Sequence, residues 1–138
     1  MKIFLDANIL IDIMLEREPF YAPAVAFITF CISQEYKITT NSLCISNAFY
    51  LSQKLIRNNK ITKNKINTIN SICSIIPMNQ SQLNMALESD FIDFEDSLHN
   101  ACAIHNDCTH IITRDKKGFK NSKLKVFTPS LFLKLYGA

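Results

Sequence analysis

Short apolar runs alternate along the chain with longer segments of helical periodicity. Five runs predict β-strands, and they lie at residues 2–5, 38–40, 75–76, 111–113 and 124–127. Between them, apolar positions recur every three or four residues over residues 21–34, 42–55 and 61–73, as in helices that bury one face. In the first of these segments we expect Val25, Ile28, Cys31 and Ile32 to share the buried face. Strands that alternate with helices predict an α/β fold with a mostly parallel sheet.

Polar residues mark the starts of three further helices. Asn8 or a neighbour is placed to cap a helix that ends near Leu15. Asp93 is placed to cap a helix with apolar residues between positions 98 and 104. The pair Thr128-Pro129 combines a capping residue with proline at the first helical position. Each of these helices is therefore expected to begin where a side chain satisfies free N–H groups.

Composition narrows the class of protein. Of 138 residues, 48% are hydrophobic and 20% are charged, and there is no repeat or linker, so we expect one compact domain over residues 1–138. With two glycines the chain lacks the glycine-rich turns of a P-loop or dinucleotide site, which excludes a nucleotide cofactor of those classes. The longest apolar stretch, residues 22–32, is far below the ~20 residues that span a bilayer, so no membrane segment is expected.

The five cysteines and the N-terminal sequence favour the cytoplasm. The cysteines are odd in number and lack a CxxC pair, which is typical of a reducing compartment, and we expect them to be small core residues. Asp6 interrupts the apolar run that a signal peptide would need. Cysteine and histidine also occur together over residues 102–110, but their spacing matches no zinc motif. Zinc is therefore not expected there.

Charge is distributed unevenly along the chain. No Asp or Glu lies between Tyr36 and Leu87, a span that holds six lysines and arginines, and residues 116–138 are also free of acids. The acids Glu88, Asp90, Asp93, Glu95 and Asp96 instead lie close together. These groups are either solvated helix faces or an acidic site flanked by basic surface, as a substrate with a phosphate backbone would need.

Three carboxylates distant in sequence are placed to meet at one edge of the sheet. Asp6 directly follows the first predicted strand, Asp115 follows the strand at 111–113, and Asp96 lies in the first turn of a predicted helix. In open α/β sheets functional side chains gather beyond the carboxyl ends of strands, and three carboxylates suit Mg²⁺ or Mn²⁺. Each acid also has a structural explanation, because a strand end, a helix first turn and a turn before Gly118 all favour Asp.

Three motifs in order resemble those of the PIN-domain nucleases. The segment DANILID at residues 6–12 resembles their opening D-x-N-x-L-x-D motif. The segment DFEDSL at 93–98, followed by ACA at 101–103, resembles their third acidic motif, and ITRD at 112–115 with Phe119 resembles their fourth. The resemblance implies a three-layer α/β/α sandwich whose acidic cluster holds Mg²⁺ or Mn²⁺ and hydrolyses single-stranded RNA. Many small bacterial members are toxins of the VapC type that pair with an antitoxin.

The resemblance also assigns roles to residues. Asp6, Asp96 and Asp115 correspond to the first, third and fourth metal carboxylates, and Asn8 and Thr113 to polar residues that orient them. Asp93 is better explained as a helix cap. The second motif departs from the family, because SLCISNA at 42–48 has Asn47 where the family has glutamate, and an amide adds no charge and is no general base. Four nearby acids are open as compensation: Glu88, Asp90, Asp93 and Glu95.

The sequence therefore predicts a metal-dependent endoribonuclease with Asp6, Asp96 and Asp115 as catalytic and metal-binding residues. Its RNA backbone contacts are expected from a basic set, namely Arg114, Lys116, Lys117, Lys54 and Arg57. The alternative is a PIN-like module that has lost efficient catalysis at Asn47 and binds RNA or protein. A flavodoxin-like domain is disfavoured because its phosphate loop would be acidic at Asp6.

Protein partners are expected as well. Besides an antitoxin, we expect a homodimer formed through the apolar N-terminal helices. The aromatic residues of this region belong to the core or to a subunit contact: Phe20, Tyr21, Phe27 and Phe30. His99 and His105 lie six residues apart on one predicted helix, so we expect them on the surface or facing a partner.

Overall fold

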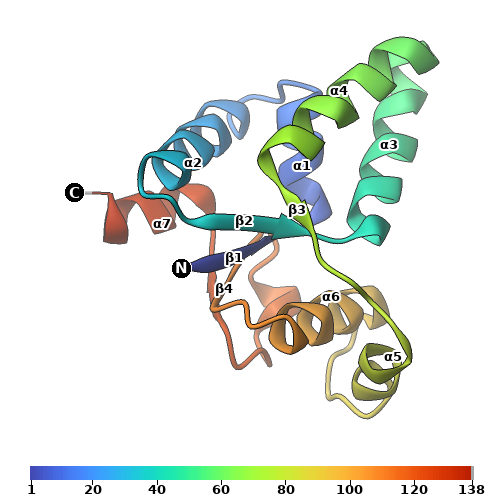
Figure 1. Ribbon diagram of the computed structural model, residues 1–138, viewed down its shortest axis with the longest axis vertical. Coiled ribbons are helices and arrows are strands. Elements are labelled where there is room, and N and C mark those ends of the chain that lie inside the picture. The colour runs from blue at the N-terminus through green and yellow to red at the C-terminus, as the bar shows by residue number, and fades with distance from the viewer. Residues whose placement is uncertain (138) are drawn as a thin grey trace.

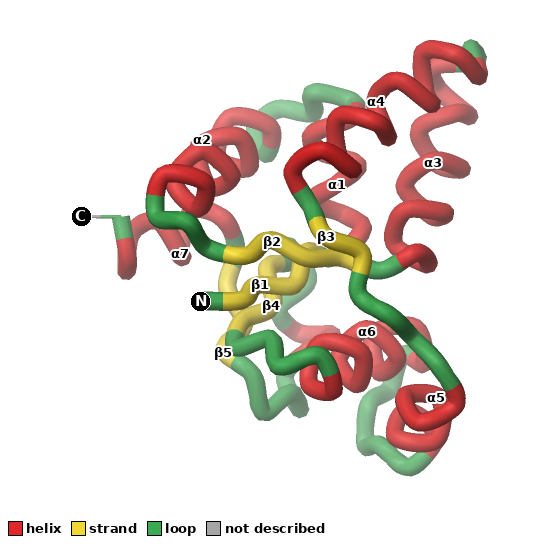
Figure 2. The backbone as a smooth tube through the Cα atoms, viewed as in Figure 1, coloured by secondary structure: helices red, strands yellow, loops and turns green. Residues whose placement is uncertain are grey.

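A five-stranded parallel sheet forms the middle layer of the molecule (Figures 1 and 2). The computed structural model describes residues 1–137. The strands lie in the order β3-β2-β1-β4-β5 and every neighbouring pair is parallel. Their bounds are β1 (Lys2–Leu5), β2 (Lys37–Thr40), β3 (Ser74–Ile75), β4 (His110–Ile112) and β5 (Lys125–Phe127). All five carboxyl ends therefore meet at one edge, as the sequence pattern predicts.

Helices cover both faces of this sheet, which confirms the predicted three-layer α/β/α sandwich. One face carries α1 (Ala7–Met14), α2 (Tyr21–Ser33), α3 (Ser42–Ile56) and α4 (Asn59–Ile72), with α7 (Pro129–Tyr136) packed along α2. The other face carries α5 (Gln80–Leu87) and α6 (Phe94–His105). A short 3-10 turn, η1 (Lys117–Phe119), follows β4. Within residues 1–137, no helix has the length and apolar character needed to cross a membrane.

Side-chain caps begin the helices. Asp93 and Thr128 accept hydrogen bonds from backbone N–H groups of α6 and α7, as predicted, and the cap of α1 is Asp6, a neighbour of Asn8. Helix α5 has no counterpart among the predicted elements. It is short and buries only Gln82 and Ala86, so its periodicity is weak, and its one signal is the capping box formed by Asn79 and Gln82.

The core lies on both faces of the sheet, under the helices of each layer. Ile3, Phe4 and Leu5 of the central strand are fully buried, and all five cysteines are buried and free, as predicted. Helix α2 turns Ala24, Phe27, Ile28 and Cys31 inward, and Phe27 meets Phe132 of α7 edge to face at 5.0 Å. Ile28 and Cys31 are buried as predicted, but the prediction was wrong for Val25 and Ile32, which are exposed.

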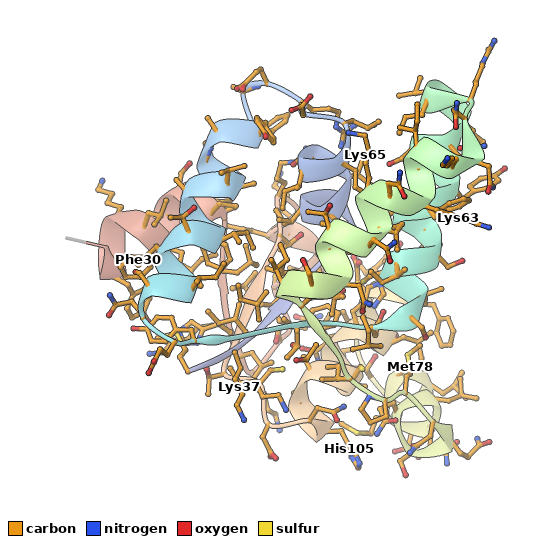
Figure 3. All side chains as sticks on the ribbon, turned by 45° about the horizontal axis from the view of Figure 1, so that its top comes forward. Phe30, Lys37, Lys63, Lys65, Met78 and His105 are labelled. Atoms are coloured by element: carbon orange, nitrogen blue, oxygen red, sulfur yellow. The ribbon has the colours of Figure 1, made fainter. Side chains whose placement is uncertain are left out.

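His99 corrects another expectation, because it is fully buried rather than on the surface. It lies on the face of α6 that covers the sheet, 5.7 Å from the Phe4 ring. Asn41 satisfies it, with Nδ2 3.0 Å from the histidine Nδ1. A buried polar ring is stable there because it has a partner. His105, by contrast, is exposed at the end of α6 (Figure 3).

Candidate active site

Asp6 lies between β1 and α1, where hydrogen bonds fix its carboxylate. Its Oδ1 accepts from the backbone N–H of Ala7 at 2.7 Å, and its Oδ2 accepts from Thr113 Oγ1 at 2.8 Å. Asn8 Nδ2 donates to Thr113 Oγ1 at 3.1 Å, which ties α1 to the loop after β4. Because β1 and β4 are neighbours in the sheet, residues distant in sequence hold one nearly buried carboxylate in place.

Asp96 and Asp115 approach this point from α6 and from the loop after β4. Asp93 Oδ1 caps α6 by accepting from the backbone N–H of Asp96 at 2.9 Å, and Asp115 Oδ1 accepts from the N–H of Gly118 at 3.1 Å. A Cβ atom at Gly118 would lie 2.4 Å from Asp96 Oδ2 and 2.6 Å from Asp115 Oδ2. With glycine at position 118, both carboxylates can lie against the same backbone in the positions that they occupy.

These residues line one pocket of about 460 Å³. Its walls hold the predicted acids Asp6, Asp96 and Asp115, the predicted supporting residues Asn8, Asn47 and Asp93, and also Glu95. The described lining residues include no lysine or arginine, and an apolar wall is formed by Ile11, Tyr50 and Leu51. The three carboxylates placed at the sheet edge by the sequence are thus brought together, with two further carboxylates beside them.

The pocket carries an excess of negative charge. Burial, and then the charges of Asp6, Asp93, Asp115 and Glu95 in that order, together raise the pKa of Asp96 to about 7. An all-oxygen donor set around uncompensated charge is the environment that Mg²⁺ or Mn²⁺ prefers. Two of these oxygens, Asp96 Oδ2 and Asp115 Oδ2, lie side by side against Gly118. The residues present therefore fit a divalent cation.

A pH-dependent stability should follow from the raised pKa of Asp96. Its pKa is 3.8 ordinarily and about 7 in the fold, so between these values the native state holds a proton that the unfolded state lacks. The free energy of unfolding then falls as pH rises from about 4 to about 7. Asp96→Asn should stabilise the metal-free protein at pH 8 by about 1–2 kcal/mol, allowing for solvent screening, and not at pH 4. Urea unfolding in EDTA at both pH values measures this, and equal differences would contradict it.

Asn47 faces the pocket and contacts an acid from the opposite layer. Its Nδ2 donates to Glu95 Oε1 at 2.7 Å, which joins α3 to the first turn of α6. Of the four acids that the sequence left open as compensation, Asp93 and Glu95 line the pocket, and Glu88 and Asp90 are not among its lining residues. The amide at position 47 thus holds a carboxylate from another helix.

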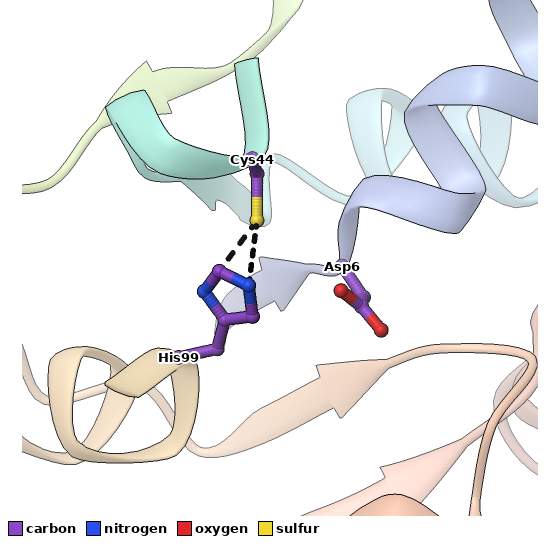
Figure 4. A group of neighbouring side chains, drawn as sticks. All are labelled: Asp6, Cys44 and His99. Atoms are coloured by element: carbon purple, nitrogen blue, oxygen red, sulfur yellow. Dashed lines mark hydrogen bonds between the residues drawn. The ribbon is translucent and has the colours of Figure 1, made fainter. Parts of the chain in front are cut away.

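A second group, Asp6, Cys44 and His99, lies buried behind the pocket (Figure 4). The Cys44 sulfur is 3.7 Å from Nδ1 and 3.6 Å from Nε2 of His99. Near-equal distances show that the sulfur is not directed along either nitrogen lone pair, and Nδ1 is already bonded to Asn41. Burial, and then the charge of Asp6, raises the pKa of the Cys44 thiol. The neutral thiol packs against the ring, and this group has packing rather than metal-ligand geometry.

Arg114 is held by an acid that sequence reasoning missed. Its Nε donates to Asp12 Oδ2 at 2.6 Å and its Nη2 to Asp12 Oδ1 at 3.2 Å, and Arg17 Nη2 also lies 2.9 Å from that Oδ1. The guanidinium stacks over the Phe20 ring at 4.1 Å. Asp12 is the last residue of the D-x-N-x-L-x-D segment, which was its only signal. Arg114 therefore anchors the loop after β4 to α1, and its contact with RNA stays a prediction.

The other predicted RNA-binding residues fall into two places. Lys116 and Lys117 are exposed beside η1, and Lys117 lines a second cavity, of about 550 Å³, that shares Asp93, Asp96 and Asp115 with the first. Lys54 and Arg57 lie at the far end of α3, where Lys54 Nζ is 4.4 Å from the centroid of the Tyr50 ring. Only the first pair adjoins the acids directly.

Comparison with known proteins gives the same fold and family. A PIN domain model matches residues 2–117. Ribonuclease VapC1 of Aquifex aeolicus (strain VF5) is 27% identical over 136 residues, covering 95% of this chain and 92% of that protein. Two solved structures resemble the whole fold. VapBC2 from Rickettsia felis, bound to a promoter DNA fragment, has a TM-score of 0.72 at 17% identity over 93% of this chain and 98% of its own. VapBC-1 from nontypeable Haemophilus influenzae has 0.71 at 15% identity over 94% and 99%. Because the PIN domain model spans most of its length, the chain belongs to the PIN domain family.

Proposed function

We propose that this chain is a divalent-metal-dependent endoribonuclease that cleaves single-stranded RNA and acts as the toxin of a toxin–antitoxin pair. The observation that carries the proposal is the meeting of Asp6, Asp96 and Asp115 in one pocket. The 27% identity to Ribonuclease VapC1 over nearly the full chain supports the same substrate class.

Some residues of the pocket would bind the cation, and others hold the binding residues in position. Asp6, Asp96 and Asp115 would hold the cation, which when bound polarises the scissile phosphate and lowers the pKa of the attacking water. Thr113 and Asn8 keep the Asp6 carboxylate in one orientation through their hydrogen bonds. Gly118 lets Asp96 and Asp115 approach each other closely. Positioning of this kind matters because small displacements of a reacting group are costly in rate.

The second cavity is suited to the RNA strand on one side of the cleavage point. Lys117 and Lys120 line it next to Asp96 and Asp115, and the exposed Ile92 forms an apolar wall. Two linked loops build it, because Asn121 Nδ2 donates to the Asp90 backbone oxygen at 3.1 Å. Lysines next to a cation site would hold flanking phosphates, and an apolar side chain would contact a base or ribose.

Removing these two lysines should weaken RNA binding in a salt-dependent manner. For Lys117→Ala/Lys120→Ala the slope of log affinity against log salt should fall by about 1.4, because each single-strand phosphate contact contributes about 0.7. Fluorescence anisotropy with a labelled oligoribonucleotide measures this. The control Lys37→Ala/Lys134→Ala removes two exposed charges elsewhere and should leave the slope closer to wild type. Equal slopes for both variants would remove this cavity from the RNA path.

Protein partners are part of the proposal. The relatives of known structure include VapBC2 and VapBC-1. Tyr50, Leu51 and Leu55 leave an exposed apolar strip on α3 beside the acidic pocket, which suits a partner segment with apolar and basic residues. The exposed Val25 and Ile32 on α2 support a homodimer through the N-terminal helices. Light scattering that gives a monomer at micromolar concentration would contradict the dimer.

The direct test is cleavage of labelled single-stranded RNA by the purified chain in millimolar Mn²⁺ or Mg²⁺, with EDTA as the control. Cleavage that requires the metal supports the enzyme. Binding of RNA without cleavage at any Mn²⁺ concentration would favour the alternative, a PIN-like module weakened at Asn47.

A further inference from the structure

Glu95 occupies the part of the pocket that faces α3. The family motif that SLCISNA resembles has a glutamate on α3, and this chain has Asn47 there. The Asn47 amide does not stand alone, because it donates through Nδ2 to Glu95 Oε1 at 2.7 Å. The Glu95 carboxylate is therefore hydrogen-bonded to the residue at the position where the family has a glutamate.

The geometry presents Glu95 for a further contact. Asn47 uses one carboxylate oxygen, and His99 Nε2 lies 3.5 Å from that same oxygen. Among residues 1–137, Oε2 has no hydrogen-bond partner, and the side chain is half exposed into the pocket. A short hydrogen bond from an amide fixes the orientation of a carboxylate.

The neighbouring acids are less suited to this role. Asp93 caps α6 by accepting from the Asp96 N–H through Oδ1, so it already has a structural role that Glu95 does not have. Glu88 and Asp90 precede α6 and do not line the pocket. Glu95 lies in the first turn of α6, one residue before Asp96, where the helix dipole also favours a negative charge.

We propose that Glu95 is the fourth carboxylate of the metal site, supplied by α6 instead of α3, and that Asn47 is its positioning residue. The inference rests on the proposed metal dependence. Glu95 on α6 thus supplies the negative charge that position 47 on α3 does not carry, and the site has four carboxylates for a hard cation.

A charge swap tests this relation. Calorimetric titration with Mn²⁺ compares wild type, Glu95→Gln, the double variant Asn47→Glu/Glu95→Gln, and Glu88→Gln as the matched control outside the pocket. Glu95→Gln should weaken Mn²⁺ binding about tenfold or more. The double variant restores one carboxylate and one amide in exchanged places, so its affinity should return to within about threefold of wild type. Glu88→Gln should bind as wild type does.

The positioning role of Asn47 is tested separately, also by Mn²⁺ affinity. Asn47→Ala keeps the Glu95 charge but loses its orienting bond, so Mn²⁺ affinity should fall by several-fold, less than in Glu95→Gln. Asn47→Gln retains the amide and should recover part of that loss. A purely structural role for Asn47 would change the melting temperature of the metal-free protein without changing Mn²⁺ affinity.

The outcomes separate this inference from the proposed function. If Glu95→Gln binds Mn²⁺ as tightly as wild type while Asp6→Asn does not, the metal site stands and Glu95 is not a ligand. If Glu95→Gln loses affinity but the double variant does not regain it, the exchange between α3 and α6 is overturned. If wild type binds no Mn²⁺ at millimolar concentration, the proposed metal dependence fails, and the role of Glu95 with it.

Discussion

Asp6→Asn is expected to lower cleavage of single-stranded RNA by about a thousandfold or more while the protein stays folded. The carboxylate is nearly buried and fixed by Ala7 and Thr113, so no other acid can take its place without moving the start of α1. Asparagine keeps the shape and is itself a good N-cap, so α1 should persist. Steady-state kinetics in Mn²⁺, with circular dichroism as the check of folding, measures the effect.

Metal binding gives an independent readout of the same variant. Millimolar Mn²⁺ should raise the melting temperature of wild type, because it binds the native state and relieves repulsion among the acids, and should raise that of Asp6→Asn much less. Asp96→Asn and Asp115→Asn should lose activity to a similar degree, since groups that act as a unit are not additive. Asp93→Asn should lower activity less, because asparagine can still cap α6. An active Asp96→Asn beside an inactive Asp93→Asn would identify Asp93 as the ligand instead.

Gly118→Ala is expected to weaken Mn²⁺ binding and RNA cleavage about a hundredfold or more. The added methyl group would overlap Asp96 Oδ2 and Asp115 Oδ2, so both carboxylates must shift from the positions that they occupy beside the pocket. The backbone at Gly118 does not require a positive φ, so the fold itself should tolerate alanine. Calorimetry and RNA cleavage, with unfolding curves for comparison, test this.

Gly137→Ala is the matched control for that substitution. It also crowds its neighbour, since a Cβ would lie 2.7 Å from the Leu133 backbone oxygen, but it lies at the end of α7 and lines no part of the acidic pocket. Its Mn²⁺ affinity should equal that of wild type. If Gly118→Ala also binds Mn²⁺ normally, the contact between Gly118 and the two carboxylates is not part of the site.

The sequence by itself determined the succession of strands and helices along the chain, except for α5, and the edge at which the acids meet. Short apolar runs predict the bounds of the strands to within one residue, because burial on both faces of a parallel sheet demands continuous apolar side chains. Asp93 and Thr128 were found as caps because capping depends on residues close in sequence. Asp6 and Asp115 were placed at one edge because parallel strands end on the same side.

Only the tertiary structure decided which side chains act on one another across that edge. The hydrogen bonds from Asn47 to Glu95 and from Arg114 to Asp12 join residues far apart in sequence, so no local sequence pattern predicts them. The burial of His99 depends on Asn41, which lies on another element, and the need for glycine at position 118 depends on Asp96. Periodicity reports which face of a helix is buried, but packing between layers selects the partner of each polar group.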